Sequence, residues 1–126
     1  MVADRYRVLI LEDDREIATV LSDTLSDEGY DIRCAPNGQE GLVILAQWVP
    51  DLILLDLTMP VMDGRSFRDA QRQLAAPLAD LPVIVLSGTH DVRAQAEYMA
   101  AAAAIAKPFE LDDVLSTVAR VCGSSR

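Results

Sequence analysis

The sequence predicts an α/β fold in which an open, parallel β-sheet is covered by helices on both faces. Three short apolar runs, at residues 8–11, 52–55 and 83–86, are continuous rather than alternating, which is typical of strands buried on both faces of a parallel sheet. A shorter segment at residues 30–35 is a further candidate strand. Segments with helical periodicity lie between these runs, so strand and helix alternate along the chain, as in a doubly wound fold with right-handed crossovers.

Start and stop signals accompany the first two expected helices. Asp14 is placed as the N-cap of the first helix, and Gly29 as its C-terminal stop. The second helix begins at Asn37-Gly38 and is ended by Pro50. Their apolar stripes are Ile17, Val20, Leu21 and Leu25 in the first, and Leu42, Leu45, Ala46 and Val49 in the second.

Two more helical stripes follow in the second half of the chain. They are Phe67, Ala70 and Leu74, then Leu111, Val114, Leu115, Val118 and Cys122. A connection from Pro77 to Pro82 follows the first of these stripes. Between the connection and the last helix, five consecutive alanines, Ala100–Ala104, have high helix propensity and are weak strand formers. We expect a helix that ends near Ala100 and a short fifth strand at Ala103–Ala106.

Length and charge restrict the class of protein. The chain has 126 residues, 11 Lys and Arg against 20 Asp and Glu, and a formal net charge of −9. This excess of acid argues against nucleic-acid and anionic-membrane partners, because like charges repel. No apolar run reaches the roughly 18 residues of a membrane helix, and no signal peptide is visible. We expect a cytoplasmic single domain at residues 1–126, with a core at 6–122 and a short tail at 123–126.

The two cysteines, Cys34 and Cys122, lie far apart and have no neighbours at metal-binding spacing. A chain that buries a core of this size does not need a disulfide. We therefore expect both to be buried thiols that behave as small hydrophobic side chains.

Polar side chains follow the expected strands. Glu12 and Asp13 follow the first, Asp56 the third, Ser87 the fourth and Lys107 the fifth. The carboxyl ends of parallel strands meet at one edge of the sheet, where ligands bind. In the flavodoxin-like strand order 2-1-3-4-5, the first and third strands are neighbours about 4.8 Å apart, which brings the three acids together. At about 5 Å and an effective dielectric of about 20, each like-charged pair costs about 3 kcal/mol. A cation must offset this cost, or a proton must be retained.

A hard divalent cation meets this need, because carboxylates, waters and a main-chain carbonyl suit octahedral Mg²⁺, which commonly accompanies a phosphate. The only histidine, His90, has no ligand-type neighbours and is expected to be exposed at the start of a helix. Lys107 is the only lysine, and its compact ammonium can bind phosphate oxygens. Ser87 can donate a hydrogen bond to a phosphoryl oxygen, and Gly88 leaves the site open. Together these residues favour the handling of a phosphoryl group on an aspartate.

Four motifs, in this order, resemble the receiver domain of two-component response regulators, in particular chemotaxis-regulator-like ones. They are Glu12-Asp13-Asp14, the run from Pro50 to Gly64 that contains Asp56, Ser87-Gly88, and Lys107-Pro108-Phe109. The resemblance extends from residue 7 to residue 121. Each motif is weak alone, but four in order and near the spacing of the family are highly specific.

The resemblance implies a role for each matching residue. Asp56 would accept a phosphoryl group from the phosphohistidine of a sensor histidine kinase or phosphotransfer protein, or from a small phosphodonor. The Mg²⁺ ligands would be Glu12, Asp13, Asp56 and the main-chain carbonyl of Thr58. Ser87 and Lys107 would hold the phosphoryl oxygens, and the Lys107–Pro108 bond would be cis. Thr58 and Thr89, two residues beyond Asp56 and Ser87, would tune the lifetime of the phosphoryl group.

The resemblance also implies that the protein is no enzyme towards other substrates. It would catalyse only its own phosphorylation and slow autodephosphorylation, by positioning and charge neutralisation. Phosphorylation would switch a docking surface for a downstream protein target, formed by the fourth and fifth helices and the last strand.

One position departs from the family pattern. Three residues before the lysine, receivers usually carry an aromatic switch residue, and here that residue is Ala104. Our hypothesis is that the signal leaves through the Ser87 loop and the alanine-rich segment, together with Tyr98. Unchanged amide exchange from Gly88 to Ala106 on adding a phosphoryl mimic would contradict it.

Plainer roles and other functions remain open at this point. Asp13 and Asp14 can both be helix-capping acids, and we assign the cap to Asp14 and the metal to Asp13. Met59-Pro60 and Asp63-Gly64 shape a turn, while Trp48 and Phe67 are packing residues. A degenerate receiver that only docks partners is one alternative. A phosphatase resembling haloacid-dehalogenase-like hydrolases is another, but it needs a second carboxylate where this chain has Thr58.

Overall fold

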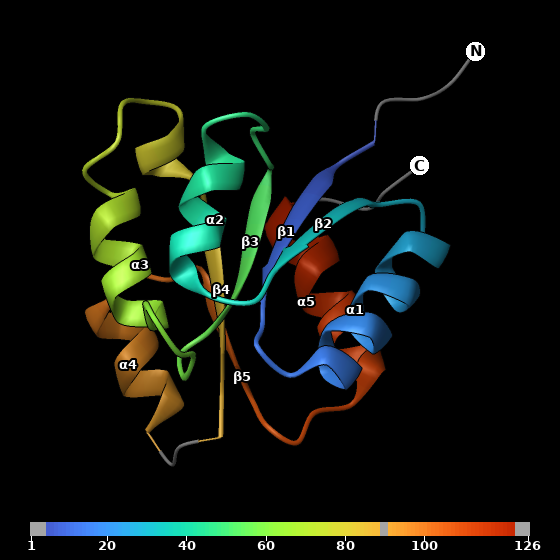
Figure 1. Ribbon diagram of the computed structural model, residues 1–126. Coiled ribbons are helices and arrows are strands. Elements are labelled where there is room, and N and C mark those ends of the chain that lie inside the picture. Colours follow the sequence, from blue (N-terminus) through green and yellow to red (C-terminus); the bar gives the residue numbers. More distant parts are fainter. Residues whose placement is uncertain (1–4, 89–90, 123–126) are drawn as a thin grey trace.

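A five-stranded parallel sheet forms the centre of the computed structural model, which describes residues 5–88 and 91–122 (Figure 1). The strands are β1 (Arg7–Leu11), β2 (Asp31–Ala35), β3 (Leu52–Asp56), β4 (Val83–Ser87) and β5 (Ala103–Ala106). Their spatial order is β2-β1-β3-β4-β5, and all neighbouring strands are parallel. The flavodoxin-like order expected from the sequence is therefore confirmed, including the short fifth strand in the alanine-rich segment.

Helices cover both faces of the sheet. They are α1 (Arg15–Asp27), α2 (Gly38–Leu45), α3 (Gly64–Gln71), α4 (Val92–Tyr98) and α5 (Leu111–Cys122), with a 3-10 helix, η1 (Leu78–Asp80), in the connection before β4. In Figure 1, α2, α3 and α4 lie on one side of the sheet, and α1 and α5 lie on the other. Among the described residues, no helix has the length and apolar character needed to cross a membrane.

The continuous apolar runs are buried on both faces of the sheet, as expected. Leu9 and Leu11 of β1 pack in the core under α2, α3 and α4, together with Trp48 and Phe67. Val8, the residue before Leu9, and Ile10 point to the opposite face and pack in the core under α1 and α5. Because successive side chains of a strand alternate between faces, both faces of β1 are apolar and neither can face water.

Capping residues mark where α1 and α2 begin and where α1 ends. Asp14 Oδ1 accepts hydrogen bonds from the backbone N–H groups of Glu16 (2.9 Å) and Ile17 (3.2 Å), which confirms Asp14 as the N-cap of α1. Gly29 follows this helix with φ 98°, a left-handed conformation that glycine adopts at no steric cost. Asn37 Oδ1 accepts from the Glu40 N–H at 2.9 Å and starts α2.

Two helices are shorter than their apolar stripes predicted. The helix α2 ends at Leu45 with Ala46 as its C-cap, so Val49 lies beyond it and is 43% exposed. The expectation that the stripe runs to Val49 is wrong, because the chain turns after Ala46 and Trp48 is the residue that enters the core. Similarly, α3 ends at Gln71, and Leu74 packs against the core from outside the helix.

The expectation that both cysteines are buried is also wrong. Cys34 is exposed, and Cys122 is partly exposed. Cys34 lies on β2, an edge strand, where its side chain lines a hollow of about 540 Å³ between α1 and β2. The expectations for Thr89, His90 and Gly123 concern positions outside the described residues.

The start of α3 packs directly on the backbone at the end of β3. A Cβ atom at Gly64 would lie 2.5 Å from the Asp56 carbonyl oxygen and 2.8 Å from Leu57 Cα, whereas a Cβ at Gly88 would meet nothing within 4 Å. We expect Gly64→Ala to lower the free energy of unfolding by about 1–3 kcal/mol, because the contact is with backbone that cannot rotate away. Gly88→Ala is the matched control and should change it by less than about 0.5 kcal/mol. Urea denaturation would measure both, and equal losses would contradict the steric argument.

Candidate functional site

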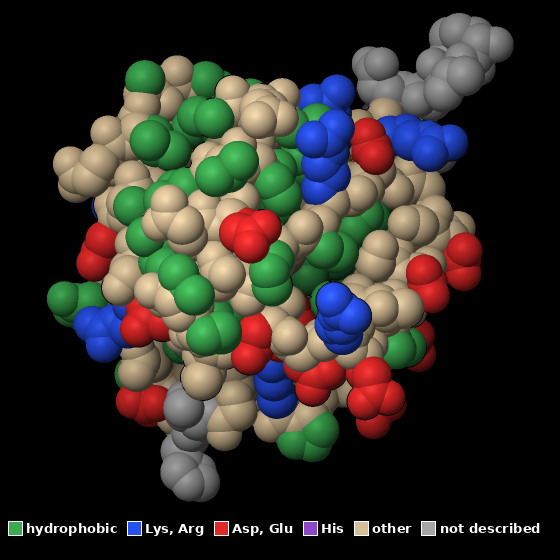
Figure 2. Space-filling view, viewed as in Figure 1, with side chains coloured by type: hydrophobic (Ala, Val, Ile, Leu, Met, Phe, Trp, Pro, Cys, Tyr) green, Lys and Arg blue, Asp and Glu red, His purple; other side chains and the backbone are tan. Residues whose placement is uncertain are grey.

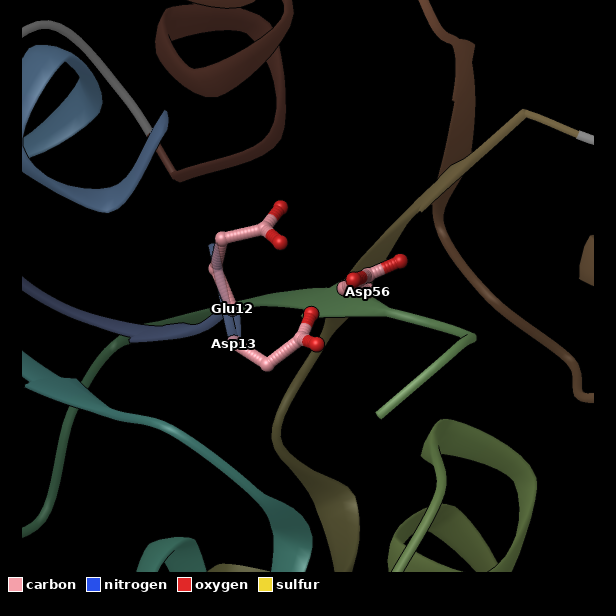
Figure 3. Close-up of side chains that lie close together, drawn as sticks. All are labelled: Glu12, Asp13 and Asp56. Carbon is pink, nitrogen blue, oxygen red and sulfur yellow. The ribbon is translucent and has the colours of Figure 1, made fainter. Parts of the chain in front are cut away.

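Three carboxylates meet where β1 and β3 end. Glu12 and Asp13 directly follow β1, and Asp56 is the last residue of β3; the neighbouring pair Leu11 and Leu55 sets this alignment. One ligand oxygen from each of the three acids lies within 4.8 Å of the others. Figure 3 shows the side chains of Glu12 and Asp13 leaving β1 and that of Asp56 leaving β3 towards the same space. The cluster expected from the strand ends is thus present.

Lys107 supplies the positive charge beside this cluster. Its Nζ lies 2.8 Å from Glu12 Oε1 and 3.4 Å from Asp56 Oδ2. The residue follows β5, two strands from β3, so its long side chain crosses the end of β4 to reach the acids. The Lys107 backbone N–H donates to the Ser87 carbonyl at 2.8 Å. This bond extends the β4–β5 pairing by one step and fixes where the lysine side chain starts.

Backbone donors hold the two buried carboxylates. The Asp14 N–H donates to Glu12 Oε2, and the Thr58 N–H donates to Asp56 Oδ1, both at 3.2 Å. Glu12 and Asp56 are each 3% exposed, whereas Asp13 is exposed to solvent. Buried carboxylates need such partners, since an unpaired buried charge is very costly. Asp13, the exposed acid, is the side chain that an incoming group can reach from solvent.

Burial and neighbouring charges shift the pKa values of two groups. Burial raises the pKa of Glu12 to about 7, and the nearby Asp56 charge acts in the same direction, although the hydrogen bonds from Lys107 and Asp14 oppose the rise. For Lys107, burial alone would lower the pKa, but the hydrogen bond to Glu12 and the negative charges of Asp56 and Glu12 raise it above its ordinary value. The ammonium is therefore held in its charged form.

Ser87 stands at the same edge of the sheet. It is the last residue of β4 and is buried, one position beyond the Leu86 that pairs with Asp56. Gly88 follows it with open space around its Cα, as expected. Thr58, two residues beyond Asp56, is exposed at the mouth of the site. The Lys107–Pro108 peptide bond is cis, which confirms that expectation.

The donor set fits Mg²⁺. Oxygens bound to one Mg²⁺ at about 2.1 Å lie at most about 4.2 Å apart, and the ion keeps several waters. Three carboxylate oxygens within 4.8 Å of one another need only small side-chain rotations to reach this spacing. Figure 2 also shows acidic side chains gathered on the lower half of the molecule, the side on which the strands of Figure 1 end. The Lys107 ammonium offsets only part of this charge.

Ala104 lies on β5, paired with Val85 of β4, and packs partly buried against the core under α2, α3 and α4. It is two positions along the strand from the end that leads to Lys107. The position of the aromatic switch residue of the family pattern is therefore occupied by a methyl group, which has no rotamer to change.

Arg68 is a buried residue that the apolar pattern of the sequence does not predict. This residue of α3 is buried at 6% exposure, and its guanidinium donates to backbone carbonyls at the end of α4 and before β4. A signal existed in the spacing: the buried face of α3 is Gly64, Phe67, Arg68 and Gln71, the i, i+3, i+4, i+7 pattern of a helix. A stripe defined by apolar residues alone cannot include a buried arginine.

Comparisons with known proteins agree with this fold and site. The family described as "Response regulator receiver domain" matches residues 8–119. The chain belongs to this family and is a receiver domain of two-component signalling, a class of phosphoacceptor domains. Such domains bind Mg²⁺ at an acidic cluster and interact with histidine kinases or phosphotransfer proteins.

Among the relatives, the response regulator MprA of Mycolicibacterium vanbaalenii is 35% identical over 112 residues, which cover 87% of this chain and 47% of that protein. The chain thus spans about half the length of the curated relatives that it matches. A putative response regulator from Chloroflexus aurantiacus has a similar structure, with a TM-score of 0.86, 29% identity and coverage of 94% and 98% of the two chains. The receiver domain of a histidine kinase from Syntrophus aciditrophicus has a TM-score of 0.83, 31% identity and coverage of 93% and 89%.

The raised pKa of Glu12 predicts a pH-dependent stability in metal-free buffer. The folded state keeps the Glu12 proton where the unfolded state has lost it, so this contribution is fully present below pH 4.5 and is lost as pH rises through about 7. Over this window we expect wild type to lose on the order of 2–3 kcal/mol more than Glu12→Gln. Chemical denaturation at several pH values would measure it. Glu16→Gln, an exposed acid of α1, should keep the wild-type dependence, and parallel curves for wild type and Glu12→Gln would refute the assignment.

Proposed function

We propose that Asp56 is the phosphoacceptor of this receiver domain. The observation that carries the proposal is that Asp56 belongs to the three-carboxylate cluster and also lies 3.4 Å from the Lys107 ammonium. A phosphoryl group attached to this carboxylate would find positive charge on one side and metal-binding oxygens on the other. The donor is the phosphohistidine of a sensor histidine kinase or phosphotransfer protein, or a small phosphodonor.

In the transfer, an oxygen of the Asp56 carboxylate attacks phosphorus. The P–O bond to Asp56 forms as the P–N bond to imidazole breaks, and the departing nitrogen takes a proton from solvent. The chemistry requires positioning and charge neutralisation more than a strong base. Lys107 turns from Glu12 to the phosphoryl oxygens, and the Ser87 hydroxyl donates a hydrogen bond to them.

The residues that would hold Mg²⁺ are Glu12, Asp13 and Asp56, with the main-chain carbonyl of Thr58. Bound Mg²⁺ supplies charge neutralisation for the phosphoryl oxygens. Asp13, which is exposed, would be a direct ligand, while buried Glu12 would act directly or through a water. Ionised Glu12 is the form that binds metal, so metal binding and loss of the Glu12 proton are linked.

The protein catalyses only its own phosphorylation and slow dephosphorylation. Thr58, which is exposed two residues beyond Asp56, tunes how water reaches the acyl phosphate. The phosphatase alternative is not favoured, because Thr58, which occupies the place of its general acid, carries no proton of suitable acidity. A docking module that is never phosphorylated is not favoured either, since Asp13, Asp56 and Lys107 are together in one site.

The output is contact with a downstream protein in the cytoplasm, without nucleic acid or membrane bound by this chain. The face of α4, β5 and α5 is the docking surface. Hollows of about 420 Å³ and 320 Å³ flank β5 on its α5 and α4 sides. The alanines of β5 leave these hollows open, and charged side chains, Arg93, Glu97 and Arg120, border the second.

Phosphorylation can be tested by intact mass. With Mg²⁺ and a small phosphodonor such as acetyl phosphate, wild type should gain one phosphoryl group that is lost at alkaline pH, as expected of an acyl phosphate. Asp56→Asn should gain none. Asp63→Asn is the matched control: it lies in the same loop and caps α3 through Oδ1, a role that asparagine also performs. A phosphoryl group on Asp56→Asn would refute the assignment of the acceptor.

Substitutions of the adjacent acids Asp13 and Asp14 distinguish metal binding from helix capping. Asp13→Asn should weaken Mg²⁺ binding about tenfold or more, because one of three anionic ligands is lost. Asp14→Asn should leave the affinity nearly unchanged, since Asp14 caps α1 and asparagine caps equally well. Isothermal titration calorimetry would compare the Mg²⁺ affinities of the two variants with that of wild type. Equal effects of the two substitutions would show that only the total negative charge matters.

A further inference from the structure

The end of α4 is held by a buried arginine from α3. Arg68 is 6% exposed, and all the acceptors described for its guanidinium are uncharged oxygens. Nε donates to the Met99 carbonyl (3.0 Å), Nη2 to the Ala100 carbonyl (3.0 Å), and Nη1 to the Leu81 carbonyl (3.2 Å) and Gln71 Oε1 (2.8 Å). One side chain therefore joins α3, the end of α4 and the start of β4.

These contacts complete the C-terminus of α4. The last carbonyls of a helix have no donor within the helix and form the negative end of its dipole. Met99 is the C-cap of α4, and Ala100 follows with φ 54°, in a conformation more usual for glycine. Arg68 thus caps α4 from a different helix and supplies a positive charge at its negative end.

A second arginine of α3 contacts the same end from the surface. The Arg65 guanidinium carbon lies 4.6 Å from the ring centre of Tyr98, the last residue of α4, which is 74% exposed. Arg65 and Arg68 are three residues apart and share one face of α3. We call these contacts of Arg65 and Arg68 with Tyr98, Met99 and Ala100 the α3–α4 clasp. Figure 1 shows α4 next to the lower part of α3, where α3 begins.

The other end of α4 is held differently. Its N-cap, Asp91, makes no side-chain capping bond, and α4 has only seven residues. Four residues separate Ser87 from Val92, the first residue of α4, so the N-terminal turn is the part of α4 nearest to Ser87 along the chain. The start of α3, in contrast, is fixed to the loop that follows Asp56, because the Gly64 N–H donates to the Leu57 carbonyl at 3.1 Å.

We propose that the α3–α4 clasp is a pivot for α4. Resting on the proposed function, the inference is that a phosphoryl group on Asp56 draws Ser87 and the first turn of α4 with it. The clasp keeps the end of α4 fixed to α3, so α4 tilts about Met99 and Ala100 instead of moving as a whole. Arg65 and Arg68 are positioning residues, because they hold one end of α4 and so set the direction in which α4 tilts. Ala104, at the position of the aromatic switch residue, cannot set this direction.

Amide exchange followed by NMR tests the pivot at two hydrogen bonds of α4. The Gln95 N–H donates to the Asp91 carbonyl in the first turn, and the Ala101 N–H donates to the Ala96 carbonyl at the end. On adding Mg²⁺ and beryllofluoride to the 126-residue chain, we expect the Gln95 exchange rate to change about tenfold or more and the Ala101 rate less than about twofold. Fluorine NMR of bound beryllofluoride reports independently whether the site is occupied.

Three variants complete the design. Arg65→Ala removes the outer contact, and Arg68→Lys keeps the buried charge but loses the planar fork that reaches both carbonyls of α4. In both, we expect the Ala101 rate to respond to beryllofluoride nearly as strongly as the Gln95 rate. Arg72→Ala removes an exposed arginine just after α3 and should behave as wild type. Circular dichroism confirms that each variant is folded, and Arg65→Ala alone decides the test if Arg68→Lys does not fold.

The outcomes separate the pivot from the proposed function. If fluorine NMR shows no bound beryllofluoride, the proposed phosphorylation site fails. If beryllofluoride binds and the Gln95 and Ala101 rates of wild type change alike, the site is right and the pivot is wrong. The pivot is also wrong if Arg65→Ala keeps the wild-type difference between the two amides.

Discussion

Repulsion among three carboxylates is the constraint on which the site depends. One carboxylate oxygen each of Glu12, Asp13 and Asp56 lies within 4.8 Å of the others, and Glu12 and Asp56 are buried. In isolation such side chains would move apart or take up protons. The Lys107 ammonium offsets part of the repulsion, and the Asp56 charge adds to the rise that burial causes in the pKa of Glu12. The uncompensated charge is what makes the site attractive to a metal ion.

The apolar side chains buried by the sheet offset the cost of holding the three acids together. Each like-charged pair costs about 3 kcal/mol at about 5 Å and an effective dielectric of about 20, whereas burying one large aliphatic side chain contributes about 1.5–3 kcal/mol. The strands bury such side chains on both faces, in two separate cores. Because β1 and β3 are central neighbours, their ends cannot separate without breaking the ladder between them. The apolar strands therefore hold the acids together against their repulsion.

The strands of the sheet also connect the site to a distant surface. Ser87 ends β4 and Lys107 follows β5, and a backbone hydrogen bond joins the two residues. Asp56 ends β3 and is followed by the loop that leads into α3. Along the chain, β3 and β4 thus lead to α3 and α4 on one side of the sheet, whereas β5 leads to α5 on the other side. In the pivot that we propose, the hydrogen bonds of Arg68 to the end of α4 direct the response of α4 to a change at the site, because Ala104 has no rotamer to change.

The sequence alone determined the alternation of strands and helices, the polar residues at the strand ends and even the short strand in the alanine-rich segment, because these depend on local patterns. The strand order, and with it the meeting of the acids and Lys107, followed from the flavodoxin-like fold class and not from a local pattern. The sequence did not determine where α2 ends, since the apolar pattern continues to Val49 although the helix does not. The exposure of Cys34 followed from the edge position of β2, and the burial of Arg68 from carbonyl partners more than 10 residues away in sequence. Only the tertiary structure decides such features, because they depend on which distant groups pack against a residue and not on the residue itself.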